Sequence, residues 1–503
     1  MTISSYDSAW QSIEAHPLGR LDALFVAEPD RLSHLTRDVA GLHFDWSKTH
    51  LDPVLIDRFV ELADAAGLAR ARDALFAGGI VNPSERRAAE HVAERGQGAP
   101  QAVALAAQHH ARMRSLIDAI EAGAFGDVTG ILHIGIGGSA LGPELLLDAL
   151  GRDSDRYIVS VVSNIDGQAF DEATDALDPA TTLVVAASKT FTTGEMLANL
   201  AAAIEWLGDG GVEDPYGQII ALTAAPQAAL DFGIDETRIL PFAQGVGGRY
   251  SLWSTVGFPV ALALGWAAFE ELLEGAAEMD RHFRLAEPRA NAPLLAAFVD
   301  LAYTQKLGCQ TRAVFAYDER LRLLPSYLQQ LEMESNGKSV TADGAPLGRS
   351  SAPVTWGGVG TDAQHAVFQL LHQGTHVVPV EFVAVIAGED GQDPEHHRIL
   401  LLNAFAQGAA LMAGQSNDDA ARAYPGNRPS VTLLLDRLDP RTLGALIAFY
   451  EHRTFANAIL LGINPFDQFG VELGKQMANA IADPEHRERF DASTRALIER
   501  AGV

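Results

Sequence analysis

A run of hydroxyl side chains follows an apolar segment that ends at Ala187. The apolar segment TLVVAA predicts a strand and the later segment MLANLAAAIEWL predicts a helix, so the run between them is a strand-to-helix turn. The polar side chains of this turn are Ser188, Lys189, Thr190, Thr192 and Thr193. Hydroxyl groups and the free N–H groups of a helix start can together surround the oxygens of an anion. Because a helix cap needs only one such hydroxyl, we predict that this turn binds an anion.

A second turn of this kind lies in ILHIGIGGSALG, residues 131–142. It places Gly135, Gly137, Gly138 and Ser139 between a predicted strand and a predicted helix. Glycines let the backbone approach an oxyanion closely, although a purely structural tight turn is an alternative interpretation. Two such turns on successive strand–helix units would both serve one phosphorylated small molecule that lies across neighbouring strand ends.

The glycine turn also satisfies the loose dinucleotide fingerprint G-x-G-x-x-G/A. That interpretation needs an acidic residue at the end of the next strand to hold a ribose. The next strand ends instead at Ser163 and Asn164, and Asp166 comes late. A nicotinamide- or flavin-dependent oxidoreductase therefore remains a weaker alternative. No metal-binding motif is present, and we expect no cofactor and no tightly held metal.

Four further stretches place reactive side chains next to glycines. VGGRYSLWS carries Arg249, QLEMESNGKS carries Glu334 and GTDAQHAVFQLLHQGT carries His365. FDQFGVELGKQ carries Gln468 and Lys475 near the end of the chain. Each residue alone is more often an ordinary surface or core group. As a set, with the phosphate-binding turns, they supply the base, acid, stabilising cation and anion clamp that one reaction needs.

Alternating apolar runs and helical patterns supply the elements that would position these residues. The pattern predicts an α/β protein with two parallel-sheet regions, covered by helices on both faces and packed around a shared cleft. The first hundred residues read mostly as amphipathic helices. The expected organisation is a helical arm (1–104), a first α/β domain (105–265), a helical connection (266–308), a second α/β domain (309–480) and a helical tail (481–503).

Composition restricts the partners and the compartment. The formal net charge is −28, from 65 acidic and 37 basic residues, and no basic run is visible, which argues against binding to nucleic acid or to an anionic membrane. Cys309 is the only cysteine, so no intrachain disulfide can form. The N-terminal segment lacks the uninterrupted apolar stretch of a signal peptide. We therefore expect a cytoplasmic protein.

The sequence resembles the phosphoglucose isomerase family, also called glucose-6-phosphate isomerases, of the bacterial type. The motifs that carry the resemblance are GIGGSALGP, SKTFTTGEM, VGGRYSLWS, LEMESNGKS, WGGVGTDAQHAVFQLLHQGT, YPGNRPS and FDQFGVELGKQMA. They follow the family's order from residue 131 to about residue 478, and NPSERRAAEH resembles an earlier motif. One match would be weak, whereas seven in register are highly specific.

The resemblance implies two sugar-isomerase (SIS) α/β domains of three layers, and an active site between them and a neighbouring subunit of a homodimer. The implied reaction interconverts glucose 6-phosphate and fructose 6-phosphate through an enediolate. Glu334 would be the base and Arg249 would stabilise the enediolate, while His365 from the partner subunit would open the ring with Lys475. Gln468 would position the substrate. The phosphate would be held by Ser188, Lys189, Thr190 and Thr193, with Gly138 and Ser139.

Three positions depart from the family's motifs, namely Ala140, Gly194 and Gly358, where Asp, Gln and Glu are usual. None of these departures removes a proposed catalytic group. They leave activity on mannose 6-phosphate or another phosphosugar open. A non-catalytic sugar-phosphate sensor on the same fold is the second interpretation, and the presence of Glu334 and Arg249 argues against it.

Overall fold

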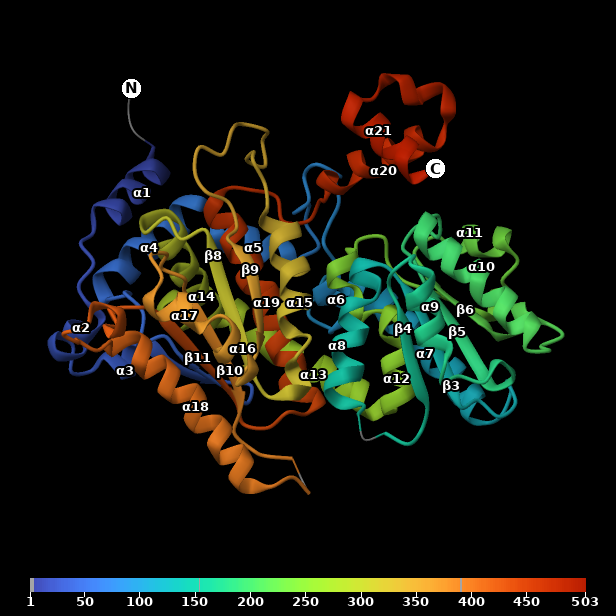
Figure 1. The fold of residues 1–503 in the computed structure, drawn as a ribbon, viewed down its shortest axis with the longest axis horizontal. Helices are drawn as coiled ribbons and strands as arrows, with labels where there is room; N and C mark the ends of the chain where they lie inside the picture. Colours follow the sequence, from blue (N-terminus) through green and yellow to red (C-terminus); the bar gives the residue numbers. More distant parts are fainter. Residues whose placement is uncertain (1–3, 153, 390) are drawn as a thin grey trace. The chain divides into compact units, whose positions relative to one another are not determined.

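The computed structural model describes residues 4–152, 154–389 and 391–503. The chain forms two compact units, one that ends at Pro465 and a smaller one from Phe466 to Val503. The larger unit holds two β-sheets (Figure 1). No helix among the described residues is long and apolar enough to cross a membrane.

The first sheet contains five parallel strands in the order β4-β3-β5-β6-β7. The strands are β3 (Gly130–Gly135), β4 (Ile158–Val162), β5 (Thr182–Ala187), β6 (Ile219–Thr223) and β7 (Ile239–Pro241). The helices between them are α8 (Leu141–Leu150), α9 (Gly167–Thr174), α10 (Gly194–Asp209) and α11 (Pro226–Phe232). Strands β3, β5 and β6 are buried along their whole length, as expected for a parallel sheet covered on both faces.

The second sheet contains six strands in the order β1-β2-β11-β10-β8-β9. Its parallel strands are β8 (Thr311–Tyr317), β9 (Val354–Val359), β10 (Val380–Val385) and β11 (Ser430–Leu435). Its helices include α15 (Leu324–Leu328), α16 (Asp362–Ala366), α17 (Phe368–Gln373), α18 (Pro394–Ala413) and α19 (Pro440–Leu461). Apolar side chains such as Phe315 and Phe382 pack towards α18, which completes one core. The prediction of an α/β protein with two parallel-sheet regions is confirmed.

The N-terminal arm differs from its helical prediction at one place. Strands β1 (Thr36–Val39) and β2 (Leu42–Asp45) form an antiparallel hairpin that adds to the edge of the second sheet through β11. Ala40 and Gly41 join them with positive φ angles of 54° and 74°. Such a two-residue turn matches the twist of a hairpin, and the sequence LHFD after it alternates apolar and polar residues.

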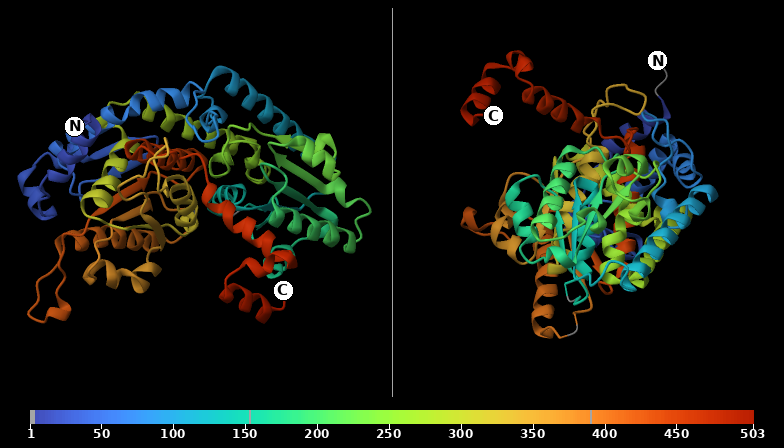
Figure 2. Two further views of the ribbon diagram at one scale, coloured as in Figure 1. Left: turned by 90° about the horizontal axis from the view of Figure 1, so that it is seen from above. Right: turned by 90° about the vertical axis from the view of Figure 1, so that its right-hand side faces the viewer.

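The remaining helices lie along both sheets. Those of the N-terminal arm are α1 (Ser5–Ala15), α2 (Leu21–Ala27), α3 (Arg31–Leu35), α4 (Pro53–Ala66), α5 (Leu68–Phe76), α6 (His91–Glu94) and α7 (Pro100–Glu121). Figure 2 shows the arm following a path past the second sheet and then, through α7, past the first. The connection between the sheets contains α12 (Phe258–Leu264), α13 (Trp266–Leu285) and α14 (Ala292–Leu301).

Helices α13 and α19 pack against each other at very short range. A Cβ at Gly275 would overlap the backbone of Arg441, and a Cβ at Gly444 would overlap the backbone of Leu272. The two glycines therefore let the helix backbones touch. Charged side chains of α19 are buried beside this contact.

The smaller unit contains α20 (Glu472–Ala482) and α21 (Ala492–Ala501), joined by a 3₁₀ segment. It begins at Phe466, before the residue at which we expected the second α/β domain to end. The domain boundaries given above stay predictions.

Candidate active site

The hydroxyl turn lies between β5 and α10, as the sequence predicted. Ser188 is buried, and its Oγ lies 3.1 Å from Thr193 Oγ1 and accepts a hydrogen bond from the Phe191 N–H. Thr193 occupies the N-cap position of α10, but its side chain makes no capping hydrogen bond. Phe191 has a φ angle of 54°, which is unusual for a bulky residue and is found at ligand-binding turns. The turn thus keeps hydroxyls grouped at a helix start without using them as caps.

Lys189 points its ammonium group into the protein. Its Nζ donates to the carbonyl oxygens of Gln244, at 2.7 Å, and Val246, at 2.8 Å. Burial, together with the charge of Arg87, lowers the pKa of Lys189 to about 8. Lys189 therefore ties the hydroxyl turn to the loop before Arg249, and brings a titratable positive charge to this predicted anion-binding turn.

The glycine turn follows β3, which is paired with β5, so the two predicted anion-binding turns lie at the carboxyl ends of neighbouring strands. A Cβ at Gly138 would overlap the backbone of Gly248 and Arg249. Gly138 is thus required for the contact between the glycine turn and the Arg249 loop. From the sequence, the glycines of this turn were expected to let the backbone approach an oxyanion.

The base of the glycine turn is held by a histidine that sequence reasoning missed. His133 lies on β3, is fully buried, and donates from Nε2 to the Ser139 carbonyl oxygen at 2.7 Å. Burial lowers its pKa to about 4, so the imidazole is neutral at pH 7. A histidine inside an apolar strand two residues before a glycine turn is the signal that could have found it.

Arg249 is buried, and its guanidinium is held from several directions. Its Nε donates to Ser335 Oγ at 2.6 Å and its Nη2 donates to the Pro465 carbonyl oxygen at 2.6 Å. Its Nη1 lies 3.3 Å from Glu334 Oε1. The structure therefore brings together the two residues that we expected to act as cation and base, although they are 85 positions apart (334 − 249) in the sequence.

Glu334 ends a π-helical segment, Gln329–Glu334, that continues α15. Its side chain is one-fifth exposed, so it remains accessible to a ligand. On the same segment, Glu332 is buried, pairs with Arg312 and accepts a hydrogen bond from Thr355 Oγ1 at 2.7 Å. π-Helical turns are rare and often occur at functional sites. These contacts fix the segment that presents Glu334.

Gln330 is a second residue that sequence reasoning missed. It lies on the same π-helical segment, and a Cβ at Gly137 would lie 2.9 Å from its side-chain nitrogen. Its amide is therefore beside the glycine turn, between the two sheets. The signal available in the sequence was its position four residues before Glu334.

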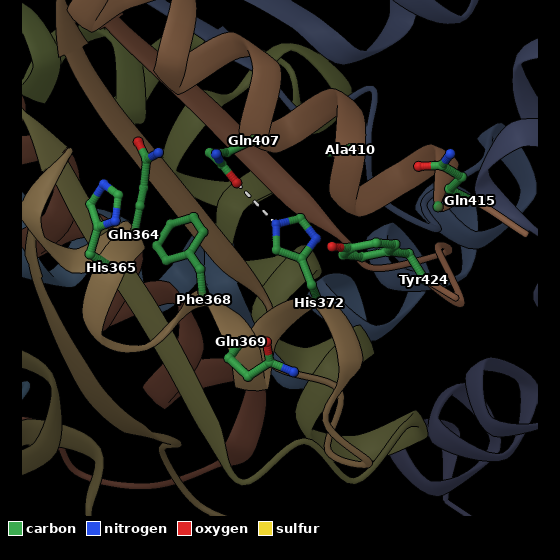
Figure 3. A pocket seen from close by; sticks show the side chains of 10 residues that line it. Gln364, His365, Phe368, Gln369, His372, Gln407, Ala410, Gln415 and Tyr424 are labelled. Atoms are coloured by element: carbon green, nitrogen blue, oxygen red, sulfur yellow. Dashed lines mark hydrogen bonds between the residues drawn. The ribbon is translucent and has the colours of Figure 1, made fainter. Parts of the chain in front are cut away.

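His365 lines a cavity that the residues described above do not line. It is exposed on α16, at the rim of this cavity of about 440 Å³ (Figure 3). His372 donates from Nε2 to Gln407 Oε1 at 2.9 Å inside this cavity, and Tyr424 packs edge-on against His372. Among the described residues, those lining the cavity include neither Glu334 nor Arg249.

Gln468 and Lys475 belong to the smaller unit. Both side chains are exposed, and Lys475 lies in the first turn of α20. Their position relative to Glu334 stays a prediction. Within the described residues, no group of three or more His, Cys, Asp or Glu side chains could hold a metal ion.

Comparison with known proteins identifies the family. A family model described as phosphoglucose isomerase matches residues 45–498. This chain belongs to the phosphoglucose isomerase family. It is 68% identical to the glucose-6-phosphate isomerase of Rhizorhabdus wittichii, over 98% of this chain and 99% of that relative. It is 60% identical to that of Zymomonas mobilis, over 99% of this chain and 98% of the relative.

A solved structure agrees with this assignment. The crystal structure of a glucose-6-phosphate isomerase from Chlamydia trachomatis matches this fold with a TM-score of 0.89 and 31% identity, and covers 97% of both chains. The family resemblance inferred from the sequence motifs is therefore confirmed.

The three departures from the phosphoglucose isomerase motifs have different surroundings. Ala140 is fully buried at the start of α8. Gly194 is the first residue of α10, and a Cβ there would meet nothing within 4 Å. A Cβ at Gly358 would make only an ordinary contact, 3.6 Å from the Ala363 side chain. A Cβ would therefore fit at Gly194 and Gly358 without displacing the backbone, whereas Ala140 is enclosed.

Proposed function

We propose that this member of the phosphoglucose isomerase family interconverts glucose 6-phosphate and fructose 6-phosphate. The observation that carries the proposal is the pairing of a partly exposed carboxylate with a buried guanidinium, Glu334 with Arg249, next to the glycine turn. Removal of a proton next to a carbonyl group needs a positioned base and a fixed positive charge where the oxyanion develops.

The chemical step uses these groups in order. Glu334 removes the proton from C2 of the open-chain aldose and returns it to C1, while Arg249 stabilises the negative charge of the enediolate. The turns after β3 and β5, with Gly138, Ser139, Ser188, Lys189, Thr190 and Thr193, hold the phosphate at the other end of the substrate. C1 is reduced and C2 is oxidised within the same sugar, and the hydroxyl proton of C2 passes to the oxygen of C1, so no external oxidant or reductant is needed.

Ring opening is assigned to His365 and Lys475, with Gln468 placing the substrate. We infer that His365 comes from a second copy of the chain, because within one chain it lines a separate cavity. Helix α18 supports this inference. It lines the same cavity through Gln407 and Ala410, and carries the exposed apolar residues Ile399, Leu402 and Phe405. An exposed apolar face beside the His365 cavity favours a homodimer interface there.

Turnover is the first test of the function. The purified protein should convert fructose 6-phosphate to glucose 6-phosphate in the presence of a chelator and without nucleotide. Glu334→Gln should lower kcat by about two to four orders of magnitude, because the variant cannot accept the C2 proton. Its affinity for inorganic phosphate, measured by calorimetry, should change little. An equal loss of turnover and of phosphate binding would mean that Glu334 is structural.

A mixing experiment tests the shared site. Glu334→Gln and His365→Ala should each be nearly inactive. If His365 acts in the partner's site, a mixed dimer has one site with both changes and one site with neither. Subunit exchange at equal concentrations should then restore about a quarter of the wild-type activity. Two copies of one variant, mixed in the same way, are the control. No recovery despite mixed dimers on native mass spectrometry would contradict a shared site.

We also infer a cytoplasmic location. The substrate is an intermediate of central sugar metabolism, and Cys309 is buried, with its pKa raised to about 11 by that burial. A thiol of this kind suits a reducing compartment but does not require one. Cell fractionation with an antibody against the chain would test it.

A further inference from the structure

Ser335 lies next to both the proposed base and the proposed cation. It follows Glu334 in the chain, is fully buried, and its Oγ is 2.6 Å from Arg249 Nε and 3.0 Å from the hydroxyl of Tyr250. We propose that Ser335 and Tyr250 are positioning residues, which fix the direction of the Arg249 guanidinium relative to the Glu334 carboxylate. This proposal rests on the proposed function.

The geometry of the guanidinium carries the first step. A guanidinium is planar, so contacts to two of its nitrogens fix the direction of the third. Arg249 donates from Nε to Ser335 and from Nη2 to the Pro465 carbonyl oxygen. These two contacts leave Nη1 directed at Glu334 Oε1, at 3.3 Å. Charge-assisted hydrogen bonds are usually about 2.7–2.9 Å long, so this pair is held slightly apart.

The separation between Arg249 and Glu334 suits the proton transfer that we propose for Glu334. A carboxylate in a close bidentate pair with arginine is a weaker base, and its oxygens are occupied. A carboxylate held at a small distance from the same cation can accept the proton from the sugar. The cation can then interact with the enediolate oxygen.

Tyr250 gives Ser335 a fixed partner. The tyrosine is almost fully buried, and its ring stacks on His91 with the ring centres 4.7 Å apart. Burial raises the pKa of Tyr250, so its hydroxyl stays protonated at neutral pH. The Tyr250 and Ser335 hydroxyls lie within hydrogen-bond distance, while the Arg249 Nε–H donates to Ser335 Oγ. Chains of this kind restrict the orientation of each member.

Removal of the Ser335 hydroxyl would leave the buried Arg249 Nε–H without this acceptor. The Glu334 carboxylate is a charged acceptor 3.3 Å from Arg249 Nη1, so the guanidinium should turn towards it. Base and cation would then pair with each other instead of with the substrate. The expected consequence is a loss of transition-state stabilisation with little loss of phosphate binding.

The test compares Ser335→Ala and Tyr250→Phe with the wild type. Three quantities are measured: kcat for fructose 6-phosphate, the affinity for inorganic phosphate, and the affinity for a hydroxamate sugar phosphate whose oxygens imitate the enediolate. For Ser335→Ala we expect kcat and hydroxamate affinity to fall together by about tenfold, and phosphate affinity to change less than about twofold. Tyr250→Phe should show the same pattern with a smaller loss.

A matched control makes the same chemical change elsewhere. Ser47→Ala removes a buried hydroxyl that has no hydrogen-bond partner among the described residues. It should keep wild-type kcat and hydroxamate affinity. If the Ser335 variant does not fold, the kcat and hydroxamate affinity of Tyr250→Phe test the proposal instead.

Two results would overturn the proposal. One is wild-type kcat in both site variants. The other is a lower kcat with unchanged hydroxamate affinity, since a merely structural role reduces the active fraction and not the affinity of the active molecules. Absence of turnover in the wild-type protein would instead contradict the proposed function itself, so the two failures are distinguishable.

Discussion

Lys189 shows how burial changes the chemistry of a single side chain. Its ammonium donates to two carbonyl oxygens, and burial lowers its pKa to about 8. Below that pH the group is charged and, in the proposed site, would attract the substrate's phosphate. Above it the free enzyme loses this charge. The sequence placed Lys189 in the anion-binding turn, whereas its two carbonyl partners are 55 and 57 residues later in the chain.

We therefore expect kcat/KM for fructose 6-phosphate to fall as the pH rises through about 8. The loss should be about tenfold, as for one charge-assisted hydrogen bond. Lys189→Met should already be low at pH 7 and should not fall further by pH 9. Lys306→Met is a control, because Lys306 contacts the Glu14 carbonyl in the N-terminal arm and should leave the wild-type profile intact. An unchanged fall near pH 8 in Lys189→Met would assign the titration to another group.

At the scale of elements, the site is built where three loops touch. The glycine turn after β3 packs on the Arg249 loop at Gly138. The Arg249 loop is in turn tied to the hydroxyl turn after β5 through Lys189, and to the segment of Glu334 through Ser335. These contacts make the spacing between the proposed phosphate site and the proposed base a property of loop packing.

Gly138→Ala should therefore disturb catalysis through the backbone. Its Cβ would overlap Gly248 and Arg249, so the Arg249 loop must move. A displacement of about 1 Å is enough to lower kcat by about a hundredfold. Gly167→Ala is the matched control, since it also follows a strand of the same sheet and a Cβ there would meet nothing within 4 Å. Steady-state kinetics on both variants, with thermal unfolding, would check this, and wild-type kcat in Gly138→Ala would contradict the loop contact.

At the scale of the whole larger unit, α19 connects distant parts of the chain. It is buried over most of its length and carries Glu451, His452 and Arg453 inside the protein. Arg95 pairs with Glu451 and Asp280, and His452 also contacts Asp280. Arg453 pairs with Asp300 and Glu381, close to the Arg312–Glu332 pair that fixes the segment of Glu334. The buried charges thus link the arm, the helical connection and the second sheet.

Arg453→Met should destabilise the protein strongly. Burial opposes ionisation of Asp300, but the charges of Arg453 and Arg312 lower its pKa, so the variant leaves buried carboxylates short of a partner. Loss of one member of a buried network typically costs about 3–5 kcal/mol of unfolding free energy. Arg441→Met, on the same helix but half exposed, should cost less than about 1 kcal/mol. Urea unfolding at pH 7 measures the unfolding free energy of both variants. Equal losses would show that the buried Arg453 contributes no more to stability than the half-exposed Arg441.

Which features could be predicted from the sequence depends on how far apart in the chain the interacting residues lie. Local patterns predicted the α/β class, the strand-to-helix turns and the residues of the candidate site, because apolar periodicity and turn chemistry act over a few residues. The hairpin Thr36–Asp45 was missed since its strands are short and its second strand, β2, pairs with β11, almost 400 residues later.

By itself, the sequence determined which side chains are available and, through its motifs, the family to which the chain belongs. Only the tertiary structure decided that Arg249 meets Glu334, that Ser335 and Pro465 direct the guanidinium, and that Gly138 serves loop packing. The physical reason is that these contacts join residues tens to hundreds of positions apart. Their distances depend on how helices and loops from different parts of the chain pack, which local pattern does not record.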